Sequence, residues 1–173
     1  MLQLDRYHLP VAFLYPEIII MAKRYPKAKT VSPFVQLVTQ YARIKSTYTN
    51  IKSAQMNKHS RSFEIVMDIT PSENSNTYEV KISYEIGKKP QAILLSPALK
   101  EYDGKMPHHI YGFDKNGHAI LCVYCPYKGE WTSSMPIAES FIPWVSTWLN
   151  TYEYWLITGE WNYNEIKCGS PKE

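Results

Sequence analysis

The chain has 173 residues, 45% of them hydrophobic, which is enough for one domain with a buried core and argues against disorder throughout. Nineteen basic and sixteen acidic residues give a net charge of +3, too mild a balance to indicate a nucleic-acid-binding protein. The three cysteines have no regular spacing, and the N-terminal apolar run is too short to cross a bilayer. We therefore expect a cytoplasmic protein that has no disulfide framework and does not bind membranes.

Residues 1–31 are predicted to form an N-terminal arm. Pro16 is placed to begin a short helix that runs to Arg24, and Pro26 would end it, because proline cannot continue a helix. The arm could cover the domain core or dock on a partner, and the sequence leaves both open. One domain is then expected over residues 32–173.

Residues 32–50 are predicted to form an amphipathic helix. Ser32 can cap it, and Pro33 suits its first position. Its apolar side chains recur at helical spacing, namely Phe34, Leu37, Val38, Tyr41, Ile44 and Tyr48. A polar loop is expected to follow over residues 53–61.

From Ser62 the apolar spacing becomes alternating, which is typical of half-buried antiparallel strands. Two such runs cover residues 62–70 and 78–86, and a third strand is expected over residues 91–96. These strands predict a meander with one apolar face, for which the preceding helix is a natural cover.

Residues 97–121 are expected to be mostly irregular, and such a long segment inside a compact domain is usually functional. A helical region is then predicted from near Pro136, with a kink or break at Pro143 and an end at Gly159. Its apolar side chains form one wide stripe, namely Ile142, Val145, Trp148, Leu149, Tyr152, Trp155 and Leu156. Such a stripe predicts a helix buried on the sheet, or one that also covers a partner. The predicted fold class is α+β, with an N-terminal helix, an antiparallel β-meander and C-terminal helices packed on the sheet.

Cys122 is the candidate nucleophile. Side chains alternate along an extended segment, so Cys122 faces the histidine-bearing loop if Leu121 and Val123 point into the core. Cys125 shares the core-facing side and is expected to be buried. A free cysteine is most often a small buried hydrophobe, but nearby histidine and polar donors favour the thiolate that a nucleophile needs.

Several segments together resemble a known family. They are Pro107-His108-His109-Ile110-Tyr111, Leu121-Cys122-Val123-Tyr124, Glu130-Trp131, Ile142-Pro143-Trp144, Trp148-Leu149, Tyr152-Glu153, Trp155 and Gly159-Glu160-Trp161. With the order of elements around them, they resemble the ubiquitin-conjugating enzyme fold. More specifically, they resemble the stand-alone conjugating-enzyme-like component of bacterial type II (short) CBASS antiphage systems. The resemblance covers residues 32–161 as architecture and is specific over residues 107–161.

This resemblance implies thioester chemistry at Cys122 without a cofactor. The cysteine would accept the C-terminal carboxyl of a cGAS-like nucleotidyltransferase and transfer it to a target amine, usually a lysine, which primes antiphage signalling. Eukaryotic conjugating enzymes carry His-Pro-Asn before the cysteine, whereas the matching triplet here is His109-Ile110-Tyr111. Tyr111 would have to supply a hydroxyl in place of the asparagine, or that role is absent. His109 and Tyr111 are thus candidate catalytic residues, with a loop-bracing hydrogen-bond pair as the alternative.

Two other function classes fit parts of the sequence. Cys122 and Cys125, with His108, His109 and His118 nearby, are residue types that bind zinc. Zinc sites, however, usually place two such cysteines on a tight turn, whereas an extended run separates their sulfurs. The second alternative is a non-catalytic binding module of the same fold, which would dock a partner through its aromatic helix and N-terminal arm.

Overall fold

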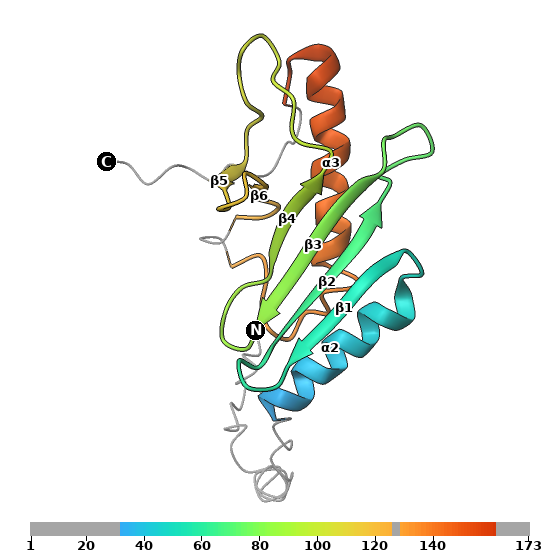
Figure 1. Cartoon of the computed structure of the whole chain (residues 1–173), viewed down its shortest axis with the longest axis vertical. Helices are drawn as coiled ribbons and strands as arrows, with labels where there is room; N and C mark the ends of the chain where they lie inside the picture. Colours follow the sequence, from blue (N-terminus) through green and yellow to red (C-terminus); the bar gives the residue numbers. More distant parts are fainter. Residues whose placement is uncertain (1–31, 126–128, 162–173) are drawn as a thin grey trace, which may run out of the picture. The chain divides into compact units, whose positions relative to one another are not determined.

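The computed structural model describes residues 32–125 and 129–161, which form an α+β fold as predicted. Helix α2 (Pro33–Thr47) precedes an antiparallel sheet, and helix α3 (Phe141–Thr158) follows it (Figure 1). Neither of these two described helices has the length and apolar character that a bilayer-spanning helix requires. The predicted arm over residues 1–31, with its short helix, lies outside the described residues.

The sheet has six strands in the order β1-β2-β3-β4-β6-β5, and all neighbouring pairs are antiparallel. The strands are β1 (Ile51–Asn57), β2 (Ser62–Ile69), β3 (Tyr78–Glu85), β4 (Gln91–Ser96), β5 (Ile110–Phe113) and β6 (Ala119–Leu121). The predicted meander is confirmed as β2, β3 and β4. Strand β6 pairs with both β4 and β5, so β5 becomes the outer strand of the sheet on that side.

One prediction about a loop was wrong, and another held only in part. Residues 53–61, expected to be a polar loop, contain most of β1. Residues 97–121 are mostly irregular as predicted, but their last part forms the β5–β6 hairpin, which was not predicted. Strand β1 lies at one edge of the sheet and no side chain in it is fully buried, so its sequence lacks apolar alternation. Strands β5 and β6 have only four and three residues, too few for a periodic pattern to stand out.

One apolar core joins the sheet to both helices. The inward side chains of β2 and β3 alternate with half-buried polar ones, and Leu37 and Ile44 of α2 are completely buried against them. The predicted stripe of α3 is confirmed by its buried residues, Phe141, Ile142, Val145, Trp148, Leu149, Tyr152 and Trp155. Each large side chain buried in this way contributes about 1.5–3 kcal/mol to folding, so α3 is a principal source of stability.

The ends of the helices differ slightly from the prediction. Helix α3 begins at Phe141 rather than near Pro136. Pro143 lies in its first turn, where proline is tolerated because no intrahelical acceptor exists for the missing N–H. Pro143 therefore marks the start of the helix and does not divide it. Gly159 ends α3 as predicted, in a left-handed conformation with φ of 74°. Helix α2 ends at Thr47, and Ser32 occupies its N-cap position without a side-chain capping bond.

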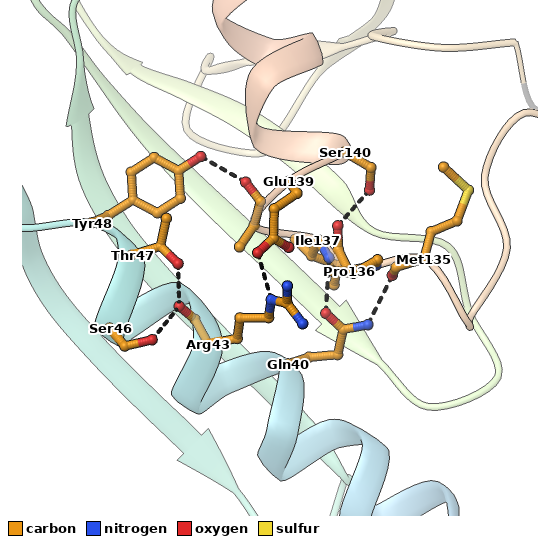
Figure 2. Close-up of polar contacts among 11 residues, drawn as sticks. Gln40, Arg43, Ser46, Thr47, Tyr48, Met135, Pro136, Ile137, Glu139 and Ser140 are labelled. Carbon is orange, nitrogen blue, oxygen red and sulfur yellow. Dashed lines mark hydrogen bonds and ion pairs between the residues drawn. The ribbon is translucent and has the colours of Figure 1, made fainter.

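Gln40 of α2 fastens the segment that leads into α3, as Figure 2 shows. Its side-chain N–H donates to the Met135 carbonyl at 2.9 Å, and its side-chain oxygen accepts from the Ile137 amide at 2.8 Å. Gln40 is 8% exposed and Ile137 is buried, so this amide satisfies two backbone groups that water does not reach easily. The connection between the last strand and α3 is thus held to the first helix.

Two more contacts join the same elements nearer the surface. The Tyr48 hydroxyl donates to the Ala138 carbonyl at 2.7 Å, and Arg43 forms an ion pair with Glu139 at 2.5 Å (Figure 2). Both side chains of this ion pair are about half exposed, so water screens their attraction. The Arg43–Glu139 ion pair, although shorter than the Tyr48 hydrogen bond, is therefore not the stronger of the two contacts.

Glu153 of α3 binds the turn between β2 and β3. Its carboxylate accepts hydrogen bonds from the Asn76 amide at 2.8 Å and from the Tyr78 hydroxyl at 2.8 Å. Burial alone would raise the pKa of Glu153, but the hydrogen bonds from Ser75, Asn76 and Tyr78 together hold it below its ordinary value. The ionised carboxylate is therefore the form that stabilises this contact.

Replacing Gln40 by Met is expected to cost about 2 kcal/mol of unfolding free energy, because it leaves the Ile137 amide and the Met135 carbonyl without partners. The matched control Arg43→Met removes the exposed ion pair from the same helix and is expected to cost less than about 1 kcal/mol. Urea unfolding followed by tryptophan fluorescence measures both. An equal cost for the two variants would contradict the ranking.

The contribution of Glu153 to stability is expected to depend on pH. Its folded pKa lies below the ordinary value of 4.5, so the stabilisation is present above that pH and is lost as the pH falls through the folded pKa. Glu153→Gln should therefore lower the urea midpoint at neutral pH, and the gap from the parent protein should narrow on acidification to about pH 3. A gap that stays constant over this range would show that the carboxylate charge is not involved.

Candidate active site

The β5–β6 hairpin carries the candidate residues, and its turn is built around Asp114. The Asp114 carboxylate accepts hydrogen bonds from the backbone amides of Asn116 and His118 at 2.8 and 2.9 Å, and its second oxygen lies 3.2 Å from the His118 ring. The hydrogen bond from the His118 backbone amide, and then the other hydrogen bonds of the turn, lower the pKa of Asp114. Gly117 takes the positive φ of 82° that such a turn needs. The turn thereby fixes which residues of β5 and β6 face each other.

Cys122 and His109 meet at the open end of this hairpin. Ile110 is paired with Leu121, and the next step along the ladder brings the Cys122 amide to the His109 carbonyl at 2.9 Å. Residues thirteen positions apart in the sequence are thus joined through their backbones. The structure brings the candidate nucleophile and the candidate histidine together, as the spacing of the two motifs required.

His109 has an unusual backbone conformation, with φ of 59°. A residue other than glycine pays about 1–2 kcal/mol for this left-handed conformation, so the surrounding structure must hold it. Its carbonyl accepts a second hydrogen bond, from the indole N–H of Trp148 on α3 at 3.0 Å. The conformation of His109 therefore depends on both the hairpin and the helix.

Aromatic packing surrounds the two imidazoles. The Trp161 ring lies 6.2 Å from His108 and 5.7 Å from His109, measured between ring centroids, and 5.4 Å from Trp148. Burial, and then the charge that His108 can carry, lower the pKa of His109 below its ordinary value. The His109 imidazole is consequently neutral at physiological pH.

Cys122 is buried, at 4% exposure, which corrects the expectation that its side chain faces outward. The expectation assumed that a residue between two core residues must be exposed. Leu121, Cys122 and Val123 are all buried, so alternation does not mark an exposed side at this position. Burial of Cys125, at 2% exposure, agrees with the prediction.

Tyr124 lies against the thiol and was not identified from the sequence. The Cys122 thiol donates to the Tyr124 carbonyl across 3.6 Å, and the tyrosine ring packs on Phe141 and Trp144. Burial, and then the negative charge that Cys122 can carry, raise the pKa of Tyr124 to about 12. The phenol is therefore protonated at neutral pH.

Tyr111 occupies a β-bulge on the outer strand. The register between β5 and β6 shifts between Ile110 and Gly112, which leaves Tyr111 as the extra residue. Its side chain is 57% exposed, unlike that of Cys122. A bulge redirects a side chain away from the regular pleat, and here it presents a phenol at the surface near the open end of the hairpin.

Two further residues hold the site and were missed at the level of sequence. Glu130 accepts a hydrogen bond at 2.7 Å from the amide of Cys125, three residues after the candidate nucleophile. Trp148 was assigned only to the core stripe, because helical periodicity reports burial and not the direction of an indole N–H. The sequence signal for these two residues was their place in the Glu130-Trp131 and Trp148-Leu149 pairs, which belong to the motifs that carry the family resemblance.

The zinc alternative gains no support from the part of the chain that the structure describes. No group of three or more His, Cys, Asp or Glu side chains in residues 32–125 and 129–161 is arranged to hold a metal ion. His118, one of the proposed ligands, is instead paired with Asp114 in the hairpin turn.

A comparison with known protein families shows what the chain is similar to. The model of a family described as the type II CBASS E2 protein matches residues 40–168, which includes α3 and the whole sheet. None of the curated proteins compared matches the chain significantly.

The geometry predicts that His109 acts on the hairpin through its backbone conformation. His109→Asn is expected to retain more stability than His109→Val, because asparagine tolerates φ near 59° and a β-branched residue does not. The two side chains are similar in size and both lose the imidazole, so the difference, about 1 kcal/mol or more in urea unfolding, isolates the backbone. Equal stabilities would mean that His109 leaves this conformation without cost.

Proposed function

The chain belongs to the type II CBASS E2 family, and from that premise we propose that it is a thioester-forming protein-conjugating enzyme with Cys122 as the nucleophile. Family membership gives it a ubiquitin-conjugating-like role in CBASS antiviral defence. The family match, which spans the hairpin and the cysteine segment, is the observation that carries the proposal.

The proposed cargo is the C-terminus of a cGAS-like nucleotidyltransferase. The Cys122 thiol loses its proton to solvent, and the thiolate attacks the carbonyl carbon of the activated C-terminal acyl group. The C–S bond forms, the bond to the activating group breaks, and that group leaves with the electron pair. A neutral target amine, such as that of a lysine, then attacks the same carbon, so the C–N bond forms, the C–S bond breaks, the thiolate leaves with the electron pair, and the nitrogen loses a proton to solvent. Thiolates are good nucleophiles and good leaving groups, so one side chain serves both steps.

The surroundings of Cys122 support this chemistry in different ways. The His109 carbonyl accepts from the Cys122 amide, so in this proposal His109 orients the cysteine backbone. Tyr111 is exposed on the bulge of β5, and in this proposal its hydroxyl donates to the oxyanion that develops on the acyl group. Tyr111 would thus replace the asparagine of the eukaryotic motif.

The burial of Cys122 sets a requirement on the mechanism. At 4% exposure its sulfur does not meet an incoming carbonyl until neighbouring groups move, so cargo binding must be coupled to local opening. The same observation favours the second candidate function, a non-catalytic binding module whose buried cysteine is part of the core. The two functions differ in whether a covalent adduct forms.

Covalent trapping distinguishes them. The protein is incubated with a C-terminal thioester of the nucleotidyltransferase, which bypasses the activation step, and the adduct is followed by intact mass. The parent protein should form an adduct that a thiol reductant cleaves, and Cys122→Ser should abolish it or convert it to a reductant-resistant oxyester. Cys125→Ser, which changes an equally buried cysteine three positions away, should retain adduct formation within about threefold.

Thermal unfolding of each variant checks that loss of the adduct is not loss of the fold. An adduct that depends on Cys125 would overturn the assignment of Cys122. Stable binding of the nucleotidyltransferase without any adduct would favour the binding module.

A further inference from the structure

The His109 carbonyl is shared by two donors from different parts of the fold. The Cys122 amide approaches it from the end of β6 at 2.9 Å, and the Trp148 indole N–H approaches it from the middle of α3 at 3.0 Å. Trp148 is 1% exposed, so water does not readily replace its hydrogen bond. One oxygen atom therefore connects the largest helix of the core to the backbone of the proposed nucleophile.

This connection controls where the thiol lies. The Cys122 sulfur is two bonds from its Cα atom, so once the amide is fixed its position is set by the φ angle of Cys122 and one side-chain torsion. The amide is fixed only while His109 keeps its left-handed conformation, with φ of 59°. The indole N–H stabilises that conformation by holding the carbonyl in the direction that Cys122 needs.

Trp148 is itself rigidly held. Its ring is stacked on Tyr152, with centroids 5.8 Å apart and planes 18° apart, and packs edge-on against Trp161 at 5.4 Å. An indole fixed in this way can hold a carbonyl without losing further side-chain freedom.

We infer that Trp148 is a positioning residue, which sets the geometry and reactivity of Cys122 through the His109 carbonyl. This inference rests on the proposed function for its catalytic consequence. Its effect on the cysteine itself is independent of any cargo and is measured separately.

The test compares Trp148→Phe with Trp155→Phe. Trp155 is 3% exposed on the same helix and packs on the same Tyr152 and Trp161 rings, so Trp155→Phe reproduces the loss of aromatic bulk. It leaves the hydrogen bond from Trp148 to the His109 carbonyl intact. Both variants are made with Cys125→Ser and Cys168→Ser, which leaves Cys122 as the last of the three cysteines in the chain.

Two rates are measured on each variant, namely alkylation of Cys122 by iodoacetamide across a pH series and thioester formation with the activated cargo. Trp148→Phe should alkylate about tenfold faster than Trp155→Phe, because a released segment opens more often, and should form the thioester about tenfold more slowly, because the thiol is misplaced. General destabilisation alone would shift both variants together. Equal alkylation profiles for the two would overturn the inference.

The outcomes separate this inference from the proposed function. If alkylation differs as expected but no variant forms a thioester, the positioning role stands and the conjugating activity is wrong. If thioesters form at the same rate in both variants and alkylation is also equal, the activity stands and the positioning role is wrong.

A second measurement needs no variant, should Trp148→Phe fail to fold. In the unmodified protein, the Trp148 indole N–H and the Cys122 amide should show slow hydrogen exchange with the same dependence on denaturant, because release of one frees the other. Fast exchange of the indole proton beside a protected Cys122 amide would show that the two bonds open separately, which contradicts the inference.

Discussion

A single carbonyl oxygen, that of His109, links the β5–β6 hairpin to helix α3. It accepts from the hairpin through the Cys122 amide and from the core through the Trp148 indole, at a residue whose left-handed backbone would not persist unaided. The arrangement of the candidate site depends on these two bonds more than on any side chain of the histidine motif. The imidazole of His109 adds aromatic packing on Trp161 and, being neutral, brings no charge to the thiol.

Helix α3 serves both as core and as support for the connection that precedes the hairpin. The Tyr152 hydroxyl accepts a hydrogen bond from the Lys100 amide at 2.6 Å, and Trp155 packs on Tyr102 with ring centroids 5.8 Å apart. Gly159 completes this contact, since a Cβ atom there would lie 2.5 Å from the Tyr102 ring. Figure 1 shows the connection between β4 and β5 running beside α3. A long segment without regular structure is thereby held at several points along one helix.

The burial of Cys122 gives the proposed chemistry a specific character. A thiol enclosed by Tyr124 and the strand ends is shielded from small oxidants and electrophiles, whose access depends on exposure. The same enclosure means that the reactive state is a locally opened one. Such opening would either break or retain two hydrogen bonds of this region, from the Trp148 indole to the His109 carbonyl and from the Cys125 amide to Glu130.

The sequence by itself determined the larger elements. Apolar period located α2, the strands β2 and β3 and the stripe of α3, because each is long enough for burial on one face to leave a repeated pattern. Strand β4 was located by the turn before it and the proline after it. The motifs within residues 107–161 indicated the family that the family model then matched. Strands β1, β5 and β6 were missed, because edge position or shortness removes that pattern.

Tertiary structure alone decided the state of the site. Alternation along the chain predicted an outward Cys122. The ladder continues past Leu121 through the hydrogen bond from the Cys122 amide to the His109 carbonyl, yet Cys122 is buried, so its burial is set by the segments that pack around it. The Trp148 indole reaches the His109 carbonyl only because α3 packs against the hairpin, and the two residues are 39 positions apart in the sequence. Local sequence encodes which faces are apolar, whereas the meeting of two distant polar groups is fixed only when those faces pack.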